Sequence, residues 1–173
     1  DMYRGVIQEK SFMTPHLKQE IQRLNYDKNI GRGRIYRVRR NGVSLGEKPN
    51  LLNAKPEELV TFLGHSNGWW RDMAQNIIVS RKLVEVAPAL EKMLLDDPMP
   101  LARLHALWTL RGLSKLDKDI VKSALQDDDD RIVCAALRVI NWPKSEYSYL
   151  EKIIDGASPE VVAHIILALG KNF

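Results

Sequence analysis

Four consecutive aspartates, residues 127–130, are the first group in this sequence that could do chemistry, because carboxylates are ligands of divalent cations. Adjacent side chains cannot all face one ion, however, and a calcium loop needs spaced oxygen ligands and a glycine at its turn. The run directly precedes an apolar stretch that begins at Ile132. We therefore expect the aspartates to cap a helix and to complement the positive end of its dipole.

Histidine and cysteine side chains are too dispersed to indicate a catalytic or metal site. The four histidines show neither a His-x-x-x-His pair nor the spacing of a triad (His16, His65, His105, His164). His105 and His164 lie in apolar stretches, which predicts ring nitrogens satisfied at the edge of a core. The single cysteine, Cys134, is surrounded by apolar residues and is expected to be a buried, unreactive thiol. We predict no catalytic residue, metal ligand or cofactor within this chain.

Residues 67–78 contain the tetrapeptide Trp-Trp-Arg-Asp and read as one amphipathic helix. Trp70 and Ala74 share a helical face with two later isoleucines, which predicts that they belong to a core. Arg71 and Arg103 are 32 residues apart and are expected to form a short ladder, paired with Asp72 or with acids between helices. The side chains that we predict to contact a partner are Trp69, Arg71, Asp72, Gln75 and Arg103.

A repeat of about 30 residues positions these side chains. Equivalent places in four apolar helices are occupied by Ala74, Ala106, Ala136 and Ile165, which are 32, 30 and 29 residues apart. A period near 30 built from helix pairs is typical of HEAT or armadillo-like repeats. The sequence therefore predicts a mainly α fold, a HEAT-like α-α superhelix (solenoid) of about four helix pairs.

Helix starts and apolar faces predict the members of these pairs. The first pair is expected at residues 56–63 and 69–81, and Pro88 marks the start of the second. Asp97 and Asp117 are expected to cap the helices that follow them. Ser158, followed by a proline and a glutamate, predicts the start of the last helix.

The first fifty residues differ from the rest of the chain in charge and pattern. They hold 11 Lys/Arg and 5 Asp/Glu, a net +6, whereas residues 51–173 hold 15 and 17, a net −2. Thr14 and Pro15 predict a short helix that ends near Asn25. Alternating β-formers and arginines in residues 31–40 predict a strand, with a possible second one in residues 3–7. The expected domains are 1–42, a linker at 43–55, and a repeat domain at 56–173.

The basic run in residues 32–40 allows two interpretations. Phosphate neutralisation by arginine would give sequence-independent affinity for nucleic acid. Alternatively, the charges protect the edge of a sheet from aggregation. Because a strand needs partners, we expect the rest of its sheet to lie before residue 1, and the first residue, Asp1, to mark a cut inside a longer protein. No apolar run is long enough to predict a membrane span.

Three motifs in order resemble a known family. Residues 1–8 (DMYRGVIQ), 33–38 (GRIYRV) and 67–75 (NGWWRDMAQ) are similar to bacterial membrane-bound dehydrogenase-type proteins. In these proteins a β-propeller resembling glucose/sorbosone dehydrogenases runs into HEAT repeats, often followed by a c-type haem domain. The resemblance implies that residues 1–42 are the tail of a propeller and that the protein is periplasmic or in the cell envelope. It transfers no catalytic residue to this chain.

Three functions remain open at this stage. The first is a non-catalytic interaction or spacer module that contacts its own propeller or a c-type haem domain. The second is a nucleic-acid-binding protein similar to DNA glycosylases built from HEAT-like repeats, against which the net −2 of the repeats argues. The third is a fragment of a sugar dehydrogenase whose active site lies outside this chain. The sequence does not indicate an oligomeric state.

Overall fold

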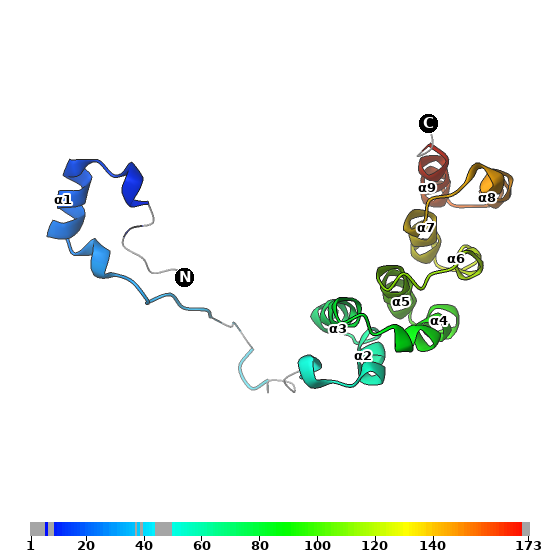
Figure 1. Ribbon diagram of the computed structural model, residues 1–173, viewed down its shortest axis with the longest axis horizontal. Coiled ribbons are helices and arrows are strands. Elements are labelled where there is room, and N and C mark those ends of the chain that lie inside the picture. Colours follow the sequence, from blue (N-terminus) through cyan, green and yellow to red (C-terminus); the bar gives the residue numbers. More distant parts are fainter. Residues whose placement is uncertain (1–5, 7–8, 37, 39, 44–49, 171–173) are drawn as a thin grey trace. The chain divides into compact units, whose positions relative to one another are not determined.

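The computed structural model (Figure 1) describes residues 6, 9–36, 38, 40–43 and 50–170. The chain divides into two compact units, Asp1–Glu47 and Lys48–Phe173. The division falls inside the segment 43–55 that the sequence predicts to be a linker. The described residues are mainly helical, and no strand is found among them.

The described residues of the first unit form one α-helix between short 3-10 turns. Its elements are η1 (Lys10–Phe12), α1 (Pro15–Arg23) and η2 (Tyr26–Lys28). Helix α1 begins as predicted, because the Thr14 Oγ1 accepts a hydrogen bond from the Leu17 N–H at 3.2 Å and Pro15 occupies the first turn. Ile21 is the one buried side chain of this helix.

The strand predicted in residues 31–40 is not formed in the described part of that segment. The side chains expected to face a sheet are instead open to solvent, with Ile35 104% and Val38 98% exposed. The physical reason is the lack of a pairing strand, because an isolated strand leaves its backbone groups and apolar face uncovered. The possible strand at residues 3–7 lies almost wholly outside the described residues.

In the described part of the second unit, residues 50–170, eight α-helices alternate between two rows (Figure 1). The inner row is α3 (Gly68–Ser80), α5 (Pro100–Gly112), α7 (Asp130–Val139) and α9 (Pro159–Gly170). The outer row is α2 (Pro56–Phe62), α4 (Ala87–Asp96), α6 (Lys118–Ala124) and α8 (Tyr147–Ile154). Short 3-10 turns η3 (Leu51–Asn53), η4 (Val84–Val86) and η5 (Lys144–Glu146) precede α2, α4 and α8.

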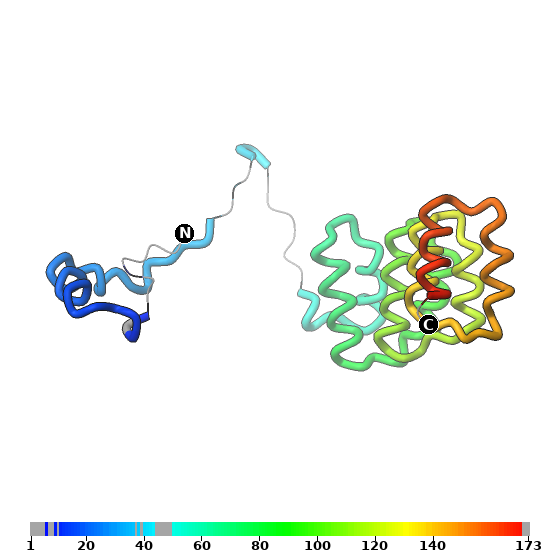
Figure 2. Tube along the Cα trace, turned by 90° about the horizontal axis from the view of Figure 1, so that it is seen from above, coloured from blue at the N-terminus to red at the C-terminus, as the bar shows by residue number. Residues whose placement is uncertain are grey.

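Each inner helix packs on its outer partner and on the next inner helix. Contacts join α2 to α3, α4 to α5, α6 to α7 and α8 to α9, and they also join α3, α5, α7 and α9 in succession. The inner row lies on the concave side of a gentle curve in Figure 1, and the helices run alongside one another in Figure 2. The predicted order of paired helices is therefore present, with starts within one or two residues of the expected ones for the first pair.

Local side chains explain where several helices begin. Side-chain oxygens accept hydrogen bonds from backbone N–H groups in the first turns of α3, α6 and α7. These oxygens belong to Asn67, Asp117 and Asp129, respectively. Proline lies in the first turns of α2, α4, α5 and α9, where its missing N–H costs nothing. Asp97 is not the N-cap of α5 that the sequence predicts, because Met99 occupies that position. The Asp97 carboxylate instead accepts a hydrogen bond from the Met99 N–H, just before the helix.

The repeat positions form the centre of the core. Ala74, Ala106, Ala136 and Ile165 are each the seventh residue of their inner helix, and each is 0% exposed. The outer helices contribute an equivalent set of fully buried side chains, namely Leu59, Leu90, Val121 and Leu150. Small side chains at three of the four inner positions allow neighbouring helices to approach closely. The core is therefore continuous from α2 to α9.

Helices α3 and α5 approach each other closely at their C-terminal ends. A Cβ atom placed on Gly112 of α5 would lie 2.7 Å from Cγ2 and 3.1 Å from Cγ1 of Val79 in α3. A valine side chain in a helix has essentially one rotamer, so it cannot move aside. Glycine at this position is therefore required by the packing of α3 on α5.

We expect Gly112→Ala to lower the free energy of unfolding by about 1–3 kcal/mol, the usual cost of overpacking, despite the better helix propensity of alanine. The measurement is urea denaturation followed by circular dichroism. Gly64→Ala is the matched control, because its Cβ would meet Ala102 Cβ at 3.6 Å, an ordinary contact. The double variant Val79→Ala/Gly112→Ala should be more stable than the sum of the single losses predicts. Additive losses would contradict a direct clash.

Candidate functional site

Two arginines occupy the same place in successive inner helices. Arg71 and Arg103 are the fourth residues of α3 and α5. The Nη1 of each donates to a backbone carbonyl six residues earlier, Arg71 to His65 at 2.7 Å and Arg103 to Asp97 at 2.8 Å. Each arginine thus makes the same contact to the turn before its own helix, as the 32-residue spacing predicts. Their remaining partners differ.

Arg103 links α5 to the turn before α7. Its Nε and Nη2 donate to the two oxygens of Asp127 at 2.8 Å each, and Nη2 also donates to Asp128 at 3.0 Å. The side chains of Arg103 and Asp127 are only 10% and 9% exposed, whereas that of Asp128 is 93% exposed. The hydrogen bonds that Arg103 donates to Asp127 raise the pKa of the Arg103 guanidinium. The pair is a buried, bidentate contact between two repeats.

The aspartate run therefore has two roles. Asp129 caps α7 as predicted, and the Arg131 guanidinium bound to it holds the pKa of the Asp129 carboxyl at about 2. Asp127 and Asp128 instead face Arg103 of the preceding repeat, and Asp127 also accepts the Asp129 N–H at 2.8 Å. The capping prediction is thus confirmed for one member of the run, and the repeat-to-repeat contact accounts for two others.

Arg71 binds a histidine where Arg103 binds a carboxylate. Its Nε donates to Nε2 of His105 in α5 at 3.3 Å, and its Nη1 also donates to the Ser66 carbonyl at 3.1 Å. Nδ1 of His105 lies 2.7 Å from Oε1 of Gln75. Because arginine can only donate, Nε2 must accept, and Nδ1 carries the proton that it donates to Gln75. His105 is therefore a neutral link between α3 and α5, with both ring nitrogens satisfied as predicted.

Burial lowers the pKa of His105 below its ordinary value of 6.5, and the nearby positive charge of Arg71 lowers it further. Asp72 acts in the opposite direction, since its carboxylate lies 4.0 Å from Nε2. These charges and the partial burial of the ring favour the neutral form that the hydrogen bonds require.

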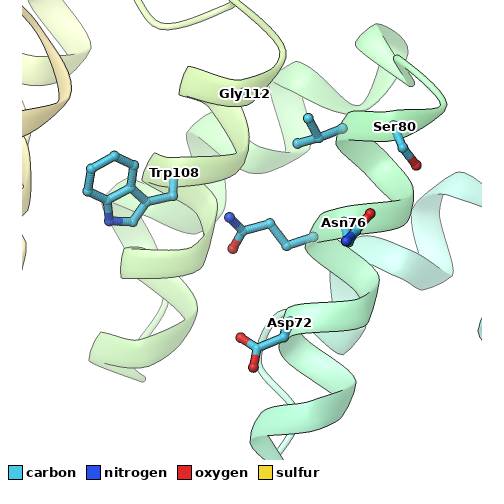
Figure 3. A pocket seen from close by; sticks show the side chains of 7 residues that line it. Asp72, Asn76, Ser80, Trp108 and Gly112 are labelled. Atoms are coloured by element: carbon cyan, nitrogen blue, oxygen red, sulfur yellow. The ribbon is translucent and has the colours of Figure 1, made fainter. Parts of the chain in front are cut away.

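An open groove of about 480 Å³ lies beside this link, between α3 and α5 (Figure 3). Asp72, Asn76 and Ser80 follow one another along α3 at a spacing of four residues, and Trp108 and Gly112 lie across from them on α5. The groove is completed by Gln75 and Val79. Its lining thus combines one carboxylate, two amides, one hydroxyl and an indole. Such a set suits hydrogen bonding and stacking with a bound segment.

The structure separates the five residues that the sequence proposes for partner binding. Asp72 and Gln75 line the groove. Arg71 does not line it, but it donates a hydrogen bond to His105, which in turn contacts Gln75. Trp69 is 55% exposed but is not among the groove residues. Arg103 is 9% exposed and its donors are directed at Asp127, Asp128 and the Asp97 carbonyl, so it presents little to a partner.

Five groove residues were not selected from the sequence, and three of them carry a polar or aromatic side chain: Asn76, Ser80 and Trp108. The signal for the first two was present, because they continue the i, i+4, i+8 row that begins at Asp72. Trp108 gave no such signal, since an aromatic residue on an apolar helix is most simply assigned to a core. Trp70 does belong to an aromatic cluster, stacked on His65 with ring centroids 4.3 Å apart and tilted against Phe62 at 5.2 Å.

Comparison of the chain with models of protein families, with curated proteins and with solved structures gives no match. Among the residues that the structure describes, no helix has both the length and the apolar character needed to cross a membrane. The interpretation of the groove therefore rests on its own residues.

We expect Asp127→Asn to lower the free energy of unfolding by about 3 kcal/mol, because it removes the buried carboxylate that pairs with the Arg103 guanidinium and leaves only the exposed Asp128. Asp128→Asn is the matched control, since it removes a solvent-exposed carboxylate that contacts the same guanidinium. This variant should lose no more than about 1 kcal/mol of unfolding free energy. Both values are measured by urea denaturation. Equal losses in the two variants would contradict the distinction drawn from burial.

We expect NMR of the ring nitrogens to show His105 as the Nδ1-protonated tautomer with a pKa below 6.5. Arg71→Met should raise this pKa, and Asp72→Asn should lower it further. Since the unfolded chain binds this proton more readily than the folded one, His105 should make stability decrease as the pH falls below 6.5. A pKa above 6.5, or an Nε2-protonated ring, would contradict the proposed link.

Proposed function

We propose that this chain is a HEAT-like helical-repeat (solenoid) module that binds another protein through the groove between α3 and α5. The observation that carries the proposal is the groove itself, an open channel of about 480 Å³ between the inner helices α3 and α5 that polar and aromatic side chains line. Repeat proteins commonly use the concave surface created by stacking their units for binding. The side chains that line the groove can bind a ligand, but they do not include a nucleophile and a base placed for a reaction.

The lining indicates the chemistry of the partner. The side chain of Asp72 is 74% exposed, so it is available to a lysine or arginine of a bound segment. Asn76 and Ser80 offer hydrogen bonds to an extended backbone, and Trp108 offers a face for an aromatic or guanidinium group. A carboxylate at this place disfavours phosphate, and the net −2 of residues 51–173 acts in the same direction. These features support a protein partner over a nucleic acid.

The resemblance of the three sequence motifs suggests the parent protein and the partner. On that proposal the chain is the interaction or spacer part of a larger, exported dehydrogenase-like protein. Its partner is then the β-propeller of the same polypeptide or a c-type haem domain, and the catalytic residues of the parent lie outside this chain.

The proposal is tested by measuring the binding of the 173-residue chain to the purified propeller and to the purified c-type haem domain by calorimetry. We expect one of them to bind, and Asp72→Ala and Asn76→Ala each to weaken that binding about tenfold or more, as for a central contact. Both side chains are exposed, so the fold should tolerate these changes. Lys92→Ala, an exposed change on α4 of the outer row, is the matched control.

Binding of neither domain would contradict the proposal, as would an equal loss of binding in the Lys92→Ala variant. A salt-sensitive affinity of the chain for duplex DNA that Asp72→Ala increases would favour the nucleic-acid interpretation instead.

A further inference from the structure

The packing of α7 on α9 brings together three side chains that the sequence analysis treats as unrelated. Cys134 comes from α7, and Glu160 and His164 come from successive turns of α9. One potential ligand atom from each, a sulfur, a carboxylate oxygen and a ring nitrogen, all lie within 4.8 Å of one another. Cys134 is 5% exposed, while Glu160 lies at the solvent boundary.

His164 is not satisfied as the sequence predicts. Its Nδ1 is shielded from solvent and has no hydrogen-bond partner among the described residues. A buried polar atom without a partner loses its hydration and gains nothing in return, at a cost of roughly 1–3 kcal/mol. His105, two helix pairs earlier and also at the sixth position of its helix, has both ring nitrogens hydrogen-bonded. The unpartnered nitrogen therefore requires an explanation specific to His164.

The three donors form a set that one divalent ion can satisfy. Thiolate, imidazole and carboxylate are the zinc ligands of proteins, and three of them with a water molecule complete a tetrahedral site. With bonds of about 2.0–2.3 Å, the ligand atoms of such a site are about 3.3–3.8 Å apart. Contraction from the observed separations needs a rotamer change of the kind that the exposed Glu160 can make.

We propose that Cys134, Glu160 and His164 bind a Zn²⁺ ion that joins α7 to α9. Binding replaces the thiol proton by the metal, so that the S–H bond breaks, a Zn–S bond forms and one proton is released to solvent for each ion bound. The proposal is independent of the groove between α3 and α5, because the two places share no residue.

The surroundings of the thiol agree with a site that takes a cation. Burial raises the pKa of Cys134, and the negative charges of Glu160 and Asp130 raise it further, against the opposing charge of Arg138. The free thiol is thus protonated at neutral pH, and a bound Zn²⁺ ion reverses the balance because it deprotonates a coordinating thiol outright.

The experiment is a titration of the chelator-treated, reduced 173-residue chain with Co²⁺, which reports a thiolate ligand through a sulfur-to-cobalt charge-transfer band. We expect the band to saturate at one equivalent and to vanish when Zn²⁺ displaces the cobalt. Zn²⁺ should also raise the melting temperature of the chain. Cys134→Ala should abolish the band, and Glu160→Gln and His164→Gln should each weaken Co²⁺ binding at least tenfold.

Two matched variants serve as controls: Glu151→Gln, an exposed glutamate on α8, and His16→Gln, an exposed histidine in the first unit. Both should bind Co²⁺ as the unchanged chain does. Because Cys134 is buried and its replacement could disturb the fold, Glu160→Gln provides a decisive variant at the surface. Absence of the charge-transfer band in the unchanged chain would overturn the proposal. So would equal affinity in the Glu160→Gln and His164→Gln variants.

Discussion

Every helix of the second unit has one apolar face that it cannot cover alone, and this constraint organises the whole unit. Each inner helix covers its neighbour at the seventh position, where Ala74, Ala106, Ala136 and Ile165 are fully buried. The outer helices add one fully buried aliphatic residue per pair. Because apolar burial is the dominant favourable term in folding, a pair removed from its neighbours would expose much of what stabilises it. Apolar burial thus makes the helices stack before any polar contact is considered.

Polar side chains then distinguish one inner contact from the next. Between α3 and α5 the link is the neutral chain from Arg71 through His105 to Gln75. Between α5 and α7 it is the buried Arg103–Asp127 ion pair. Between α7 and α9 the polar side chains that meet are Cys134, Glu160 and His164, where we propose the zinc site. Identical apolar stripes would allow helices to pair out of order, whereas three different polar contacts favour a single order.

The sequence was sufficient for the features that depend on local pattern. Helix pairs, several caps and the buried repeat positions follow from periodicity and from residues such as Thr14, Asp117 and Asp129. It was insufficient where a contact joins side chains of different repeats. Nothing within the sequence neighbourhood of His105 shows that Arg71 lies 3.3 Å away, and Cys134 and His164 are 30 residues apart. The strand expected at residues 31–40 failed for the same reason, since a strand depends on a distant partner that local β-propensity cannot reveal.

The contrast between Arg103 and Asp72 shows that the role of a charged side chain depends on what it contacts in the folded structure. Both lie near the N-terminal ends of inner helices, and both were candidates for contact with a partner. Arg103 faces the next repeat, where an aspartate three residues before α7 receives it, so that its charge serves the order of the helices. Asp72 is one residue further round its helix than the equivalent Arg71, and this shift of about 100° turns it from the helix contact to the groove. A change of one residue in register therefore separates a side chain that holds the repeats together from one that is free to bind.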